Sequence, residues 1–182
     1  ERVARLAEWI GEDLGLPQSD MTALRYAAML HDVGLIGVPP SRLRQRANWP
    51  DATERSQLAN HPPSGAALLE GIDFLNDSFE AIRHHHERVD GHGYPDQRAG
   101  SEIPLLARIV AVCDAFDALT LTRPGHEGLK TEAALAALSA RVGTHLDGDV
   151  VAALASALER HTWIGVELGT LGVAEESIID HD

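Results

Sequence analysis

The sequence of 182 residues is poor in lysine, cysteine and aromatic side chains. Its single cysteine, Cys113, excludes a disulfide within the chain, which is compatible with a reducing cytoplasm. Lys130 is the only lysine, so nearly all of the 15 basic residues are arginines. The 28 acidic residues give a formal net charge of −13, which argues against binding to a nucleic-acid polymer, since that function needs a basic surface. Any anionic substrate must therefore be met by local positive charge.

The sequence also lacks long apolar segments. No apolar run approaches the roughly 20 residues of a membrane-spanning helix, and the first residues do not resemble a signal peptide. We therefore expect a cytoplasmic protein without a membrane span. The length and the 44% hydrophobic content suffice for one domain, predicted over residues 1–161. Residues 162–182 carry five acidic side chains without a lysine or arginine, and glycines interrupt their short apolar pieces. They are predicted to form an irregular acidic C-terminal tail.

Helical spacing of apolar residues recurs along the predicted domain, and no strand pattern occurs before the tail. The sequence therefore predicts an all-α fold, a compact bundle of roughly seven to nine helices. Asp77, Thr131 and Asp147 are predicted to cap helices. Pro62 and Pro63 are predicted to lie at the beginning of a helix, where a missing backbone donor does no harm.

Residues 84–95 contain four histidines, two acidic residues, two glycines and a proline. Their sequence is His-His-His-Glu-Arg-Val-Asp-Gly-His-Gly-Tyr-Pro. Adjacent histidines at the end of an apolar helix, followed by a glycine-containing turn, are typical of a metal site, because imidazole nitrogens bind metals and glycine lets the backbone bend around them. A solvated histidine-rich loop is the alternative interpretation.

Three further segments offer metal ligands. His31 and Asp32 end an apolar helical run, His61 opens another helix, and Asp114 lies in a segment that is apolar on nearly every face. An unpaired ionised carboxylate is costly to bury, so Asp114 is expected to be neutralised, to have a charged partner or to bind a metal. This combination of imidazoles and carboxylates predicts a site for iron, manganese or zinc rather than a thiolate site.

The order and spacing of these motifs resemble the HD-GYP family, in the HD superfamily of metal-dependent phosphohydrolases. The motifs are His31-Asp32 followed by Gly34, His61-Pro62, His85-His86-Glu87-Arg88, Asp90-Gly91-His92-Gly93-Tyr94-Pro95, and Arg108 through Asp114 to Asp117. The resemblance extends from Arg2 to about Leu154. It implies an all-helical bacterial signalling phosphodiesterase that hydrolyses cyclic di-GMP to pGpG or GMP, with iron or manganese as cofactor.

The resemblance also implies roles for individual residues. It assigns His31, Asp32 and Asp114 to a first divalent metal ion, with His31 and Asp32 as the catalytic pair. It assigns His61, His85 and His86 to a second ion, with Asp32 bridging the two. The predicted substrate-binding residues are Gly93, Tyr94, Arg123 and His126. Residues 90–95, called the GYP loop below, are an expected contact surface for signalling partner proteins, and a homodimer is a further interpretation.

Other histidines and acids have simpler interpretations. His84 and His92 are expected to be loop or surface residues rather than ligands, and Asp117 is expected to make an internal hydrogen bond.

Three departures from the family pattern bear on activity. Leu35 stands where a lysine usually contacts the substrate phosphate, and leucine can neither donate a hydrogen bond nor carry charge. Gly125 and His126 stand where a tyrosine and a basic residue are common. The family also has a ligand histidine two positions upstream of Glu1, so the first metal site is expected to be weak in the sequence given.

The sequence leaves three functions open. The first is a metal-dependent cyclic di-GMP phosphodiesterase, with activity reduced by Leu35. The second is a catalytically weak or inactive cyclic-dinucleotide sensor or interaction module. The third is an HD phosphohydrolase that acts on another nucleotide.

Overall fold

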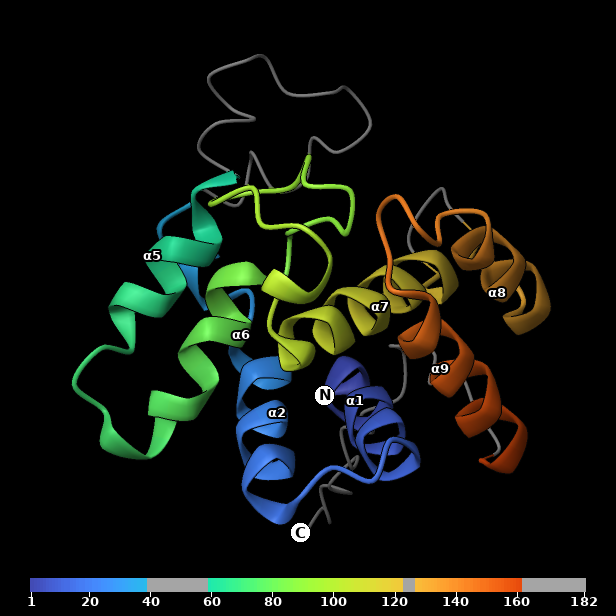
Figure 1. The fold of residues 1–182 in the computed structure, drawn as a ribbon, viewed down its shortest axis with the longest axis horizontal. Coiled ribbons are helices and arrows are strands. Elements are labelled where there is room, and N and C mark those ends of the chain that lie inside the picture. Colours follow the sequence, from blue (N-terminus) through green and yellow to red (C-terminus); the bar gives the residue numbers. More distant parts are fainter. Residues whose placement is uncertain (39–58, 123–126, 162–182) are drawn as a thin grey trace, which may run out of the picture.

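The computed structural model describes residues 1–38, 59–122 and 127–161, in which helices are joined by turns and loops (Figure 1). Its α-helices are α1 (Arg2–Asp13), α2 (Gln18–Leu30), α5 (His61–Leu68), α6 (Phe79–His84), α7 (Leu105–Thr120), α8 (Thr131–Ser139) and α9 (Gly148–Arg160). Short 3₁₀ helices lie at η1 (Val33–Gly37), η2 (Asp73–Ser78) and η3 (Gly100–Glu102). The described ranges contain no β-strand, apart from one isolated bridge between Val142 and Leu146. The predicted all-α class is therefore confirmed.

Some predictions fall elsewhere in the chain. The sequence also predicts a helix from Asp51 to about Asn60, and at most a short basic helix at residues 41–46. These lie mostly or wholly outside the described residues, and so does the predicted tail at residues 162–182. Among the helices that are described, none is long and apolar enough to cross a membrane.

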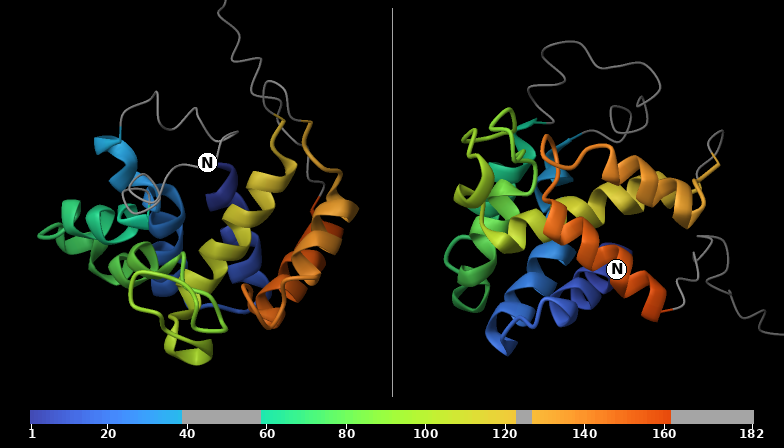
Figure 2. Two further views of the ribbon diagram at one scale, coloured as in Figure 1. Left: turned by 90° about the horizontal axis from the view of Figure 1, so that it is seen from above. Right: turned by 45° about the vertical axis from the view of Figure 1, so that its right-hand side comes forward.

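Helix α7 runs through the middle of the molecule, and α1, α2, α6, α8 and α9 pack around it (Figures 1 and 2). Its residues Ile109, Val110, Val112, Cys113 and Phe116 have no exposed surface. Cys113 thus packs as a small apolar side chain, and burial raises the pKa of its thiol well above the usual value. Because α7 is central, an acidic residue on it can be shared with the helices on either side.

Pairs of an arginine and a carboxylate connect α7 to α1 and to the start of α9. Arg2 of α1 donates to Asp117 at 2.5 Å, which confirms the internal hydrogen bond expected for Asp117. Arg108 donates to Asp147 at 2.5 Å, and Asp147 also accepts from the backbone amides of Asp149 and Val150 at the start of α9. Asp147 is therefore both the predicted helix cap and a connection between α7 and α9.

Two predicted caps are wrong. Thr131 is the first residue of α8 rather than its cap, and Lys130 precedes it. Asp77 lies within η2, and Ser78 occupies the cap position of α6. The Ser78 hydroxyl makes no capping bond to α6, and it donates to the carbonyl oxygen of Ala23 on α2, at 3.0 Å. A contact between helices has thus replaced the local one, whereas Pro62 and Pro63 lie in the first turn of α5 as predicted.

Candidate metal centre

The predicted ligands meet where three helix termini face the middle of α7. His31 and Asp32 follow the last turn of α2, His61 is the first residue of α5, and His85 and His86 follow the last residue of α6. Asp114 comes from α7. The packing of these helix ends brings together residues that are distant in sequence. Two consecutive residues, such as His85 and His86, can point to the same place at a helix end, whereas on the side of a helix they point about 100° apart.

Asp32 lies between two imidazoles. Its Oδ1 is 3.2 Å from Nε2 of His61, and its Oδ2 is 3.5 Å from Nε2 of His31. Nε2 of His31 is also 3.8 Å from Oδ1 of Asp114. The two oxygens of one carboxylate therefore face two different groups of ligands, which is the arrangement that a bridging ligand requires.

The ring orientations present Nε2 atoms to the centre. Nδ1 of His31 lies 2.9 Å from the carbonyl oxygen of Ala28, and Nδ1 of His85 lies 2.7 Å from that of Ile82. A carbonyl oxygen only accepts, so each Nδ1 carries the hydrogen and each neutral ring keeps a lone pair on Nε2. Backbone carbonyls fix metal-binding histidines in this tautomer.

Three imidazoles come close enough to share one ion. Ligand atoms of His61, His85 and His86 all lie within 4.8 Å of one another, and Nε2 of His61 is 3.2 Å from Nε2 of His85. His61 and His85 are 6% and 1% exposed. Buried nitrogens at this separation need a proton or a cation between them. The donor set therefore fits a divalent metal.

The surroundings of Asp32 and His85 favour the protonation states that bind a metal, an ionised carboxylate and a neutral imidazole. Burial by itself would raise the pKa of Asp32, but the hydrogen bond from His61 and the neighbouring imidazoles outweigh it and hold this pKa far below its usual range. Burial and the charges of His86 and His31 lower the pKa of His85 well below its usual value. The carboxylate is thus ionised and the His85 ring neutral at neutral pH, as metal binding requires.

The GYP loop forms one side of the centre. The ring of Tyr94 lies 5.0 Å from that of His86, tilted by 33°. Burial, with the charges of Asp114 and Asp32, raises the pKa of the Tyr94 hydroxyl to about 12. The hydroxyl is therefore neutral at neutral pH and can donate a hydrogen bond beside the carboxylates.

Two glycines allow backbone segments to approach closely. A Cβ atom on Gly34 would lie 2.1 Å from the carbonyl oxygen of His61, and one on Gly93 would lie 2.3 Å from the amide nitrogen of Arg88. Gly34 thus lets η1 pack on the start of α5, and Gly93 lets the GYP loop pack on the turn after α6. Gly93 is buried, so close packing explains why this position is a glycine. Contact of Gly93 with a substrate stays a prediction.

The remaining predicted residues have different outcomes. Arg123 and His126 lie outside the described residues. The His92 side chain is 79% exposed, as predicted. The expectation for His84 is wrong, because this histidine is fully buried and contacts Asp96 rather than solvent. Sequence reasoning missed Asp96, although Glu80, Arg83, His84 and Glu87 follow the spacing of one helix face and could have indicated a partner for it.

Comparisons with known proteins agree on a family. A family model described as "HD domain" matches residues 1–150. The chain is 41% identical over 156 residues to the "Cyclic di-GMP phosphodiesterase response regulator RpfG" of Xanthomonas campestris, covering 85% of this chain and 41% of that protein. It is 35% identical over 162 residues to the "3'3'-cGAMP-specific phosphodiesterase 3" of Vibrio cholerae, covering 87% of this chain and 34% of that protein. The chain thus spans less than half the length of these relatives.

A solved structure shares the fold. The protein Bd1817 from Bdellovibrio bacteriovorus, described as an HDG"Y"P protein, superposes with a TM-score of 0.70 at 21% identity. The match covers 87% of this chain and 50% of that one.

Proposed function

Because the chain belongs to the HD-domain family, in its HD-GYP group, we propose that it is a metal-dependent phosphodiesterase that hydrolyses cyclic di-GMP to pGpG or GMP. The observation that carries this proposal is the position of Asp32 between His31 and His61, beside the imidazoles of His85 and His86. A carboxylate with an imidazole on each side suits a pair of ions, whereas a single structural ion needs one closed set of ligands.

The ligands divide into two groups in this proposal. His31, Asp32 and Asp114 hold the first ion, and His61, His85 and His86 hold the second, with Asp32 shared. Imidazole and carboxylate donors suit iron or manganese. When bound, a pair of such ions supplies positive charge for a phosphate and lowers the pKa of a water molecule. The negative charge of the whole protein makes this local positive charge necessary.

The side chains themselves orient the reactants. The ionised Asp32 carboxylate, which lies between His31 and His61, accepts a hydrogen bond from the attacking water. Water oxygen bonds to phosphorus, the P–O3′ bond breaks, and a proton passes to the leaving 3′ oxygen. Tyr94 offers its ring to a base and its neutral hydroxyl to a phosphate. Arg123 and His126 are proposed to contact the other phosphate.

A second substrate has a specific observation in its favour. Several relatives carry names that specify 3'3'-cGAMP, among them one at 35% identity. This molecule has the same two phosphodiester bonds and differs in one base. We therefore place both cyclic dinucleotides in one test, together with the alternative of a sensor that binds without turnover.

The test uses the whole chain loaded with Mn²⁺ or Fe²⁺ under anaerobic conditions. Each cyclic dinucleotide is added, and linear products are followed by chromatography. We expect cyclic di-GMP to yield pGpG. Binding without product would support the sensor instead, and neither binding nor product would favour a different nucleotide.

Two histidine variants provide a matched comparison. His85→Ala removes a buried Nε2 donor, whereas His92→Ala removes an imidazole of the GYP loop that is 79% exposed and lies seven positions further along the chain. Loss of a residue that only hydrogen-bonds to a metal ligand lowers metal affinity about 10 to 100-fold. Since His85 is proposed to bind the metal directly, we expect His85→Ala to lower Mn²⁺ affinity at least about tenfold. The affinity of His92→Ala should be unchanged. Equal metal content in all three proteins would contradict the ligand assignment.

The GYP loop is also proposed as a contact surface for signalling partner proteins. Gly93→Val should displace the loop, because its side chain would meet the backbone of Glu87 and Arg88, while His61 and His85 keep their positions. Unchanged substrate and partner binding in this variant would contradict the proposal.

A further inference from the structure

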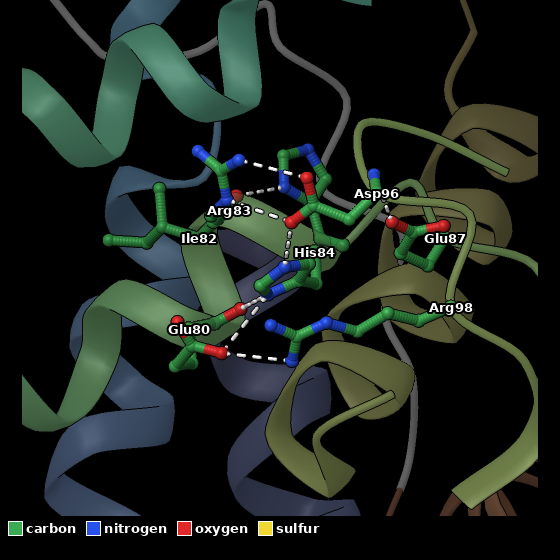
Figure 3. Close-up of polar contacts among 8 residues, drawn as sticks. Glu80, Ile82, Arg83, His84, Glu87, Asp96 and Arg98 are labelled. Atoms are coloured by element: carbon green, nitrogen blue, oxygen red, sulfur yellow. Dashed lines mark hydrogen bonds and ion pairs between the residues drawn. The ribbon is translucent and has the colours of Figure 1, made fainter. Parts of the chain in front are cut away.

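Helix α6 carries functional residues on two faces. Ile82 lies in the core, and the two histidines that follow the helix reach the candidate metal centre. The opposite face presents Glu80, Arg83 and His84 to residues 96–98, which return from the GYP loop (Figure 3). The six-residue helix α6 therefore positions the two proposed metal ligands that follow it, and it also binds residues 96–98.

Asp96 is the centre of the second face. Its Oδ2 accepts from Nε of Arg83 at 3.0 Å, and its Oδ1 accepts from Nη2 of the same guanidinium at 2.9 Å. Nε2 of His84 lies 2.8 Å from Oδ2, and His84 has no exposed surface (Figure 3). The bonds from Arg83 and His84 lower the pKa of Asp96 to about 2. These are charge-assisted bonds in fixed geometry, which are stronger than neutral ones.

The backbone of Asp96 is fixed as well. Its amide donates to Oε1 of Glu87 at 2.7 Å, and Glu87 is only 4% exposed. Two residues further, Arg98 pairs with Glu80 at 3.0 Å. Residues 96–98 are therefore bonded to α6 through the side chains of Asp96 and Arg98, and to the turn after α6 through the backbone amide of Asp96.

His84, Glu87 and Asp96 also have the composition of a cation site. Their contacts argue against that use. Both oxygens of Asp96 already accept from Arg83, and both nitrogens of His84 are engaged, by the carbonyl of Glu80 at 2.8 Å and by Asp96. A cation would have to displace a guanidinium from the same carboxylate. Attachment of the loop explains these contacts without such a displacement.

The attachment point is next to the residue that faces the centre. Asp96 follows Tyr94 by two positions, and the Tyr94 amide donates to the carbonyl oxygen of His86 at 3.2 Å. Between these two bonds the chain has little freedom, so the position of Asp96 determines where the Tyr94 ring lies above His86.

We infer that Asp96, held by Arg83 and His84, is a positioning residue that fixes Tyr94 beside the metal centre and thereby sets the affinity for the cyclic dinucleotide. The inference rests on the proposed function only for its substrate. The hydrogen bonds of Asp96 go to Arg83, His84 and Glu87, none of which is a proposed metal ligand, so we expect its effect to pass through Tyr94.

The first test needs no substrate. Hydrogen exchange is compared for the whole chain, Asp96→Ala, Asp96→Asn and the control Glu8→Gln, which removes a carboxylate from the Arg25–Glu8 pair between α1 and α2. We expect both Asp96 variants to lose protection in residues 91–97, while α1 and α7 keep theirs and Mn²⁺ affinity changes less than about threefold. Asn should lose less than Ala, because it keeps one acceptor. Unchanged protection of this segment in Asp96→Ala would overturn the inference.

The second test asks whether Asp96 acts through Tyr94. Asp96→Ala, Tyr94→Ala and the double variant are compared with the unchanged chain on cyclic di-GMP. We expect Asp96→Ala to raise KM about tenfold with little change in kcat. A tenfold change is what the loss of stacking between one base and the Tyr94 ring would cause. The same change should have little further effect when Tyr94 is already alanine, because residues that act as a unit are not additive. Additive losses would overturn the inference and leave a purely structural role.

The two tests also separate this inference from the proposed function. If the unchanged chain hydrolyses neither cyclic dinucleotide, the proposed function fails, and hydrogen exchange still decides whether Asp96 fixes the loop. If turnover is present and exchange is unchanged in Asp96→Ala, the proposed function stands and the inference fails.

Discussion

Leu35 occupies the turn directly after the candidate metal centre. It lies in η1 and is half-buried, and its amide donates to the carbonyl oxygen of Asp32 at 2.9 Å. Neither Leu35 nor its neighbour Ile36 belongs to the hydrophobic core, and Ile36 is 82% exposed. The structure therefore favours a surface position for Leu35, where a longer polar side chain can be accommodated.

We predict that Leu35→Lys increases affinity for cyclic di-GMP about tenfold to hundredfold without lowering the melting temperature. The reason is that a charge-assisted hydrogen bond to phosphate is worth about 1.5 to 3 kcal/mol. Ile36→Lys is the control, since it adds the same charge one residue away on an exposed side chain. A binding titration and a melting curve measure both effects. Lower stability without a gain in affinity would show that Leu35 does not stand at a phosphate-contacting position.

At the scale of elements, the junction of η1 and α5 sets the distance between Asp32 and His61. The backbone of Gly34 approaches both the carbonyl oxygen of His61 and the amide nitrogen of Gly65. A Cβ atom at Gly34 would lie 2.1 Å from that oxygen and 2.7 Å from that nitrogen, so backbone would have to move. This junction therefore couples fold stability to the geometry of the centre.

We predict that Gly34→Ala lowers the free energy of unfolding by about 1 to 3 kcal/mol, the usual cost of overpacking, and weakens Mn²⁺ binding. Gly37→Ala is a matched control in the same 3₁₀ helix, because a Cβ atom there meets nothing within 4 Å. The control should be neutral or slightly stabilising. Denaturant unfolding and a Mn²⁺ titration give both quantities. If the two variants behave alike, close approach at Gly34 does not position His61.

The whole molecule is held together by contacts that connect the central helix α7 with its neighbours. Asp147 joins α7 to α9, since it accepts from Arg108 and caps α9, with its side chain only 15% exposed. Burial would raise the pKa of Asp147, but the bonds from Arg108 and from two backbone amides outweigh it and hold this pKa below its usual range. A group with a lowered folded-state pKa adds stability above its unfolded pKa and loses it as the pH falls through the folded one.

We predict that Asp147→Asn lowers the free energy of unfolding at pH 7 by about 1 kcal/mol, the difference between a charge-assisted and a neutral hydrogen bond. Asparagine still caps the helix, but it loses the charge opposite Arg108. The difference from the unchanged chain should start to shrink as the pH falls below about 3.9, where Asp147 of the unfolded chain takes up a proton. It should be smallest below the lowered folded-state pKa, where the folded chain is protonated too. Asp149→Asn, in the first turn of the same helix, is the control. Denaturant unfolding at several pH values measures the trend. A difference independent of pH would show that the Asp147 charge contributes nothing.

The sequence alone determined the helical class, most helix positions and the residues that meet at the centre. Apolar periodicity, the prolines of α5 and the cap at Asp147 are local signals, and local signals depend on neighbours along the chain. The order of the histidine and aspartate motifs also determined the family. These properties required no knowledge of which helices touch.

Tertiary structure decided what depends on distant contacts. Ser78 bonds to Ala23 instead of capping α6, and His84 is buried against Asp96 although the sequence predicts a loop or surface residue. The two oxygens of Asp32 face His31 and His61 only because α2, η1 and α5 pack with Gly34 between them. A hydrogen-bonding side chain binds the partner that packing brings within about 3 Å, and that partner is set by the fold rather than by spacing along the sequence.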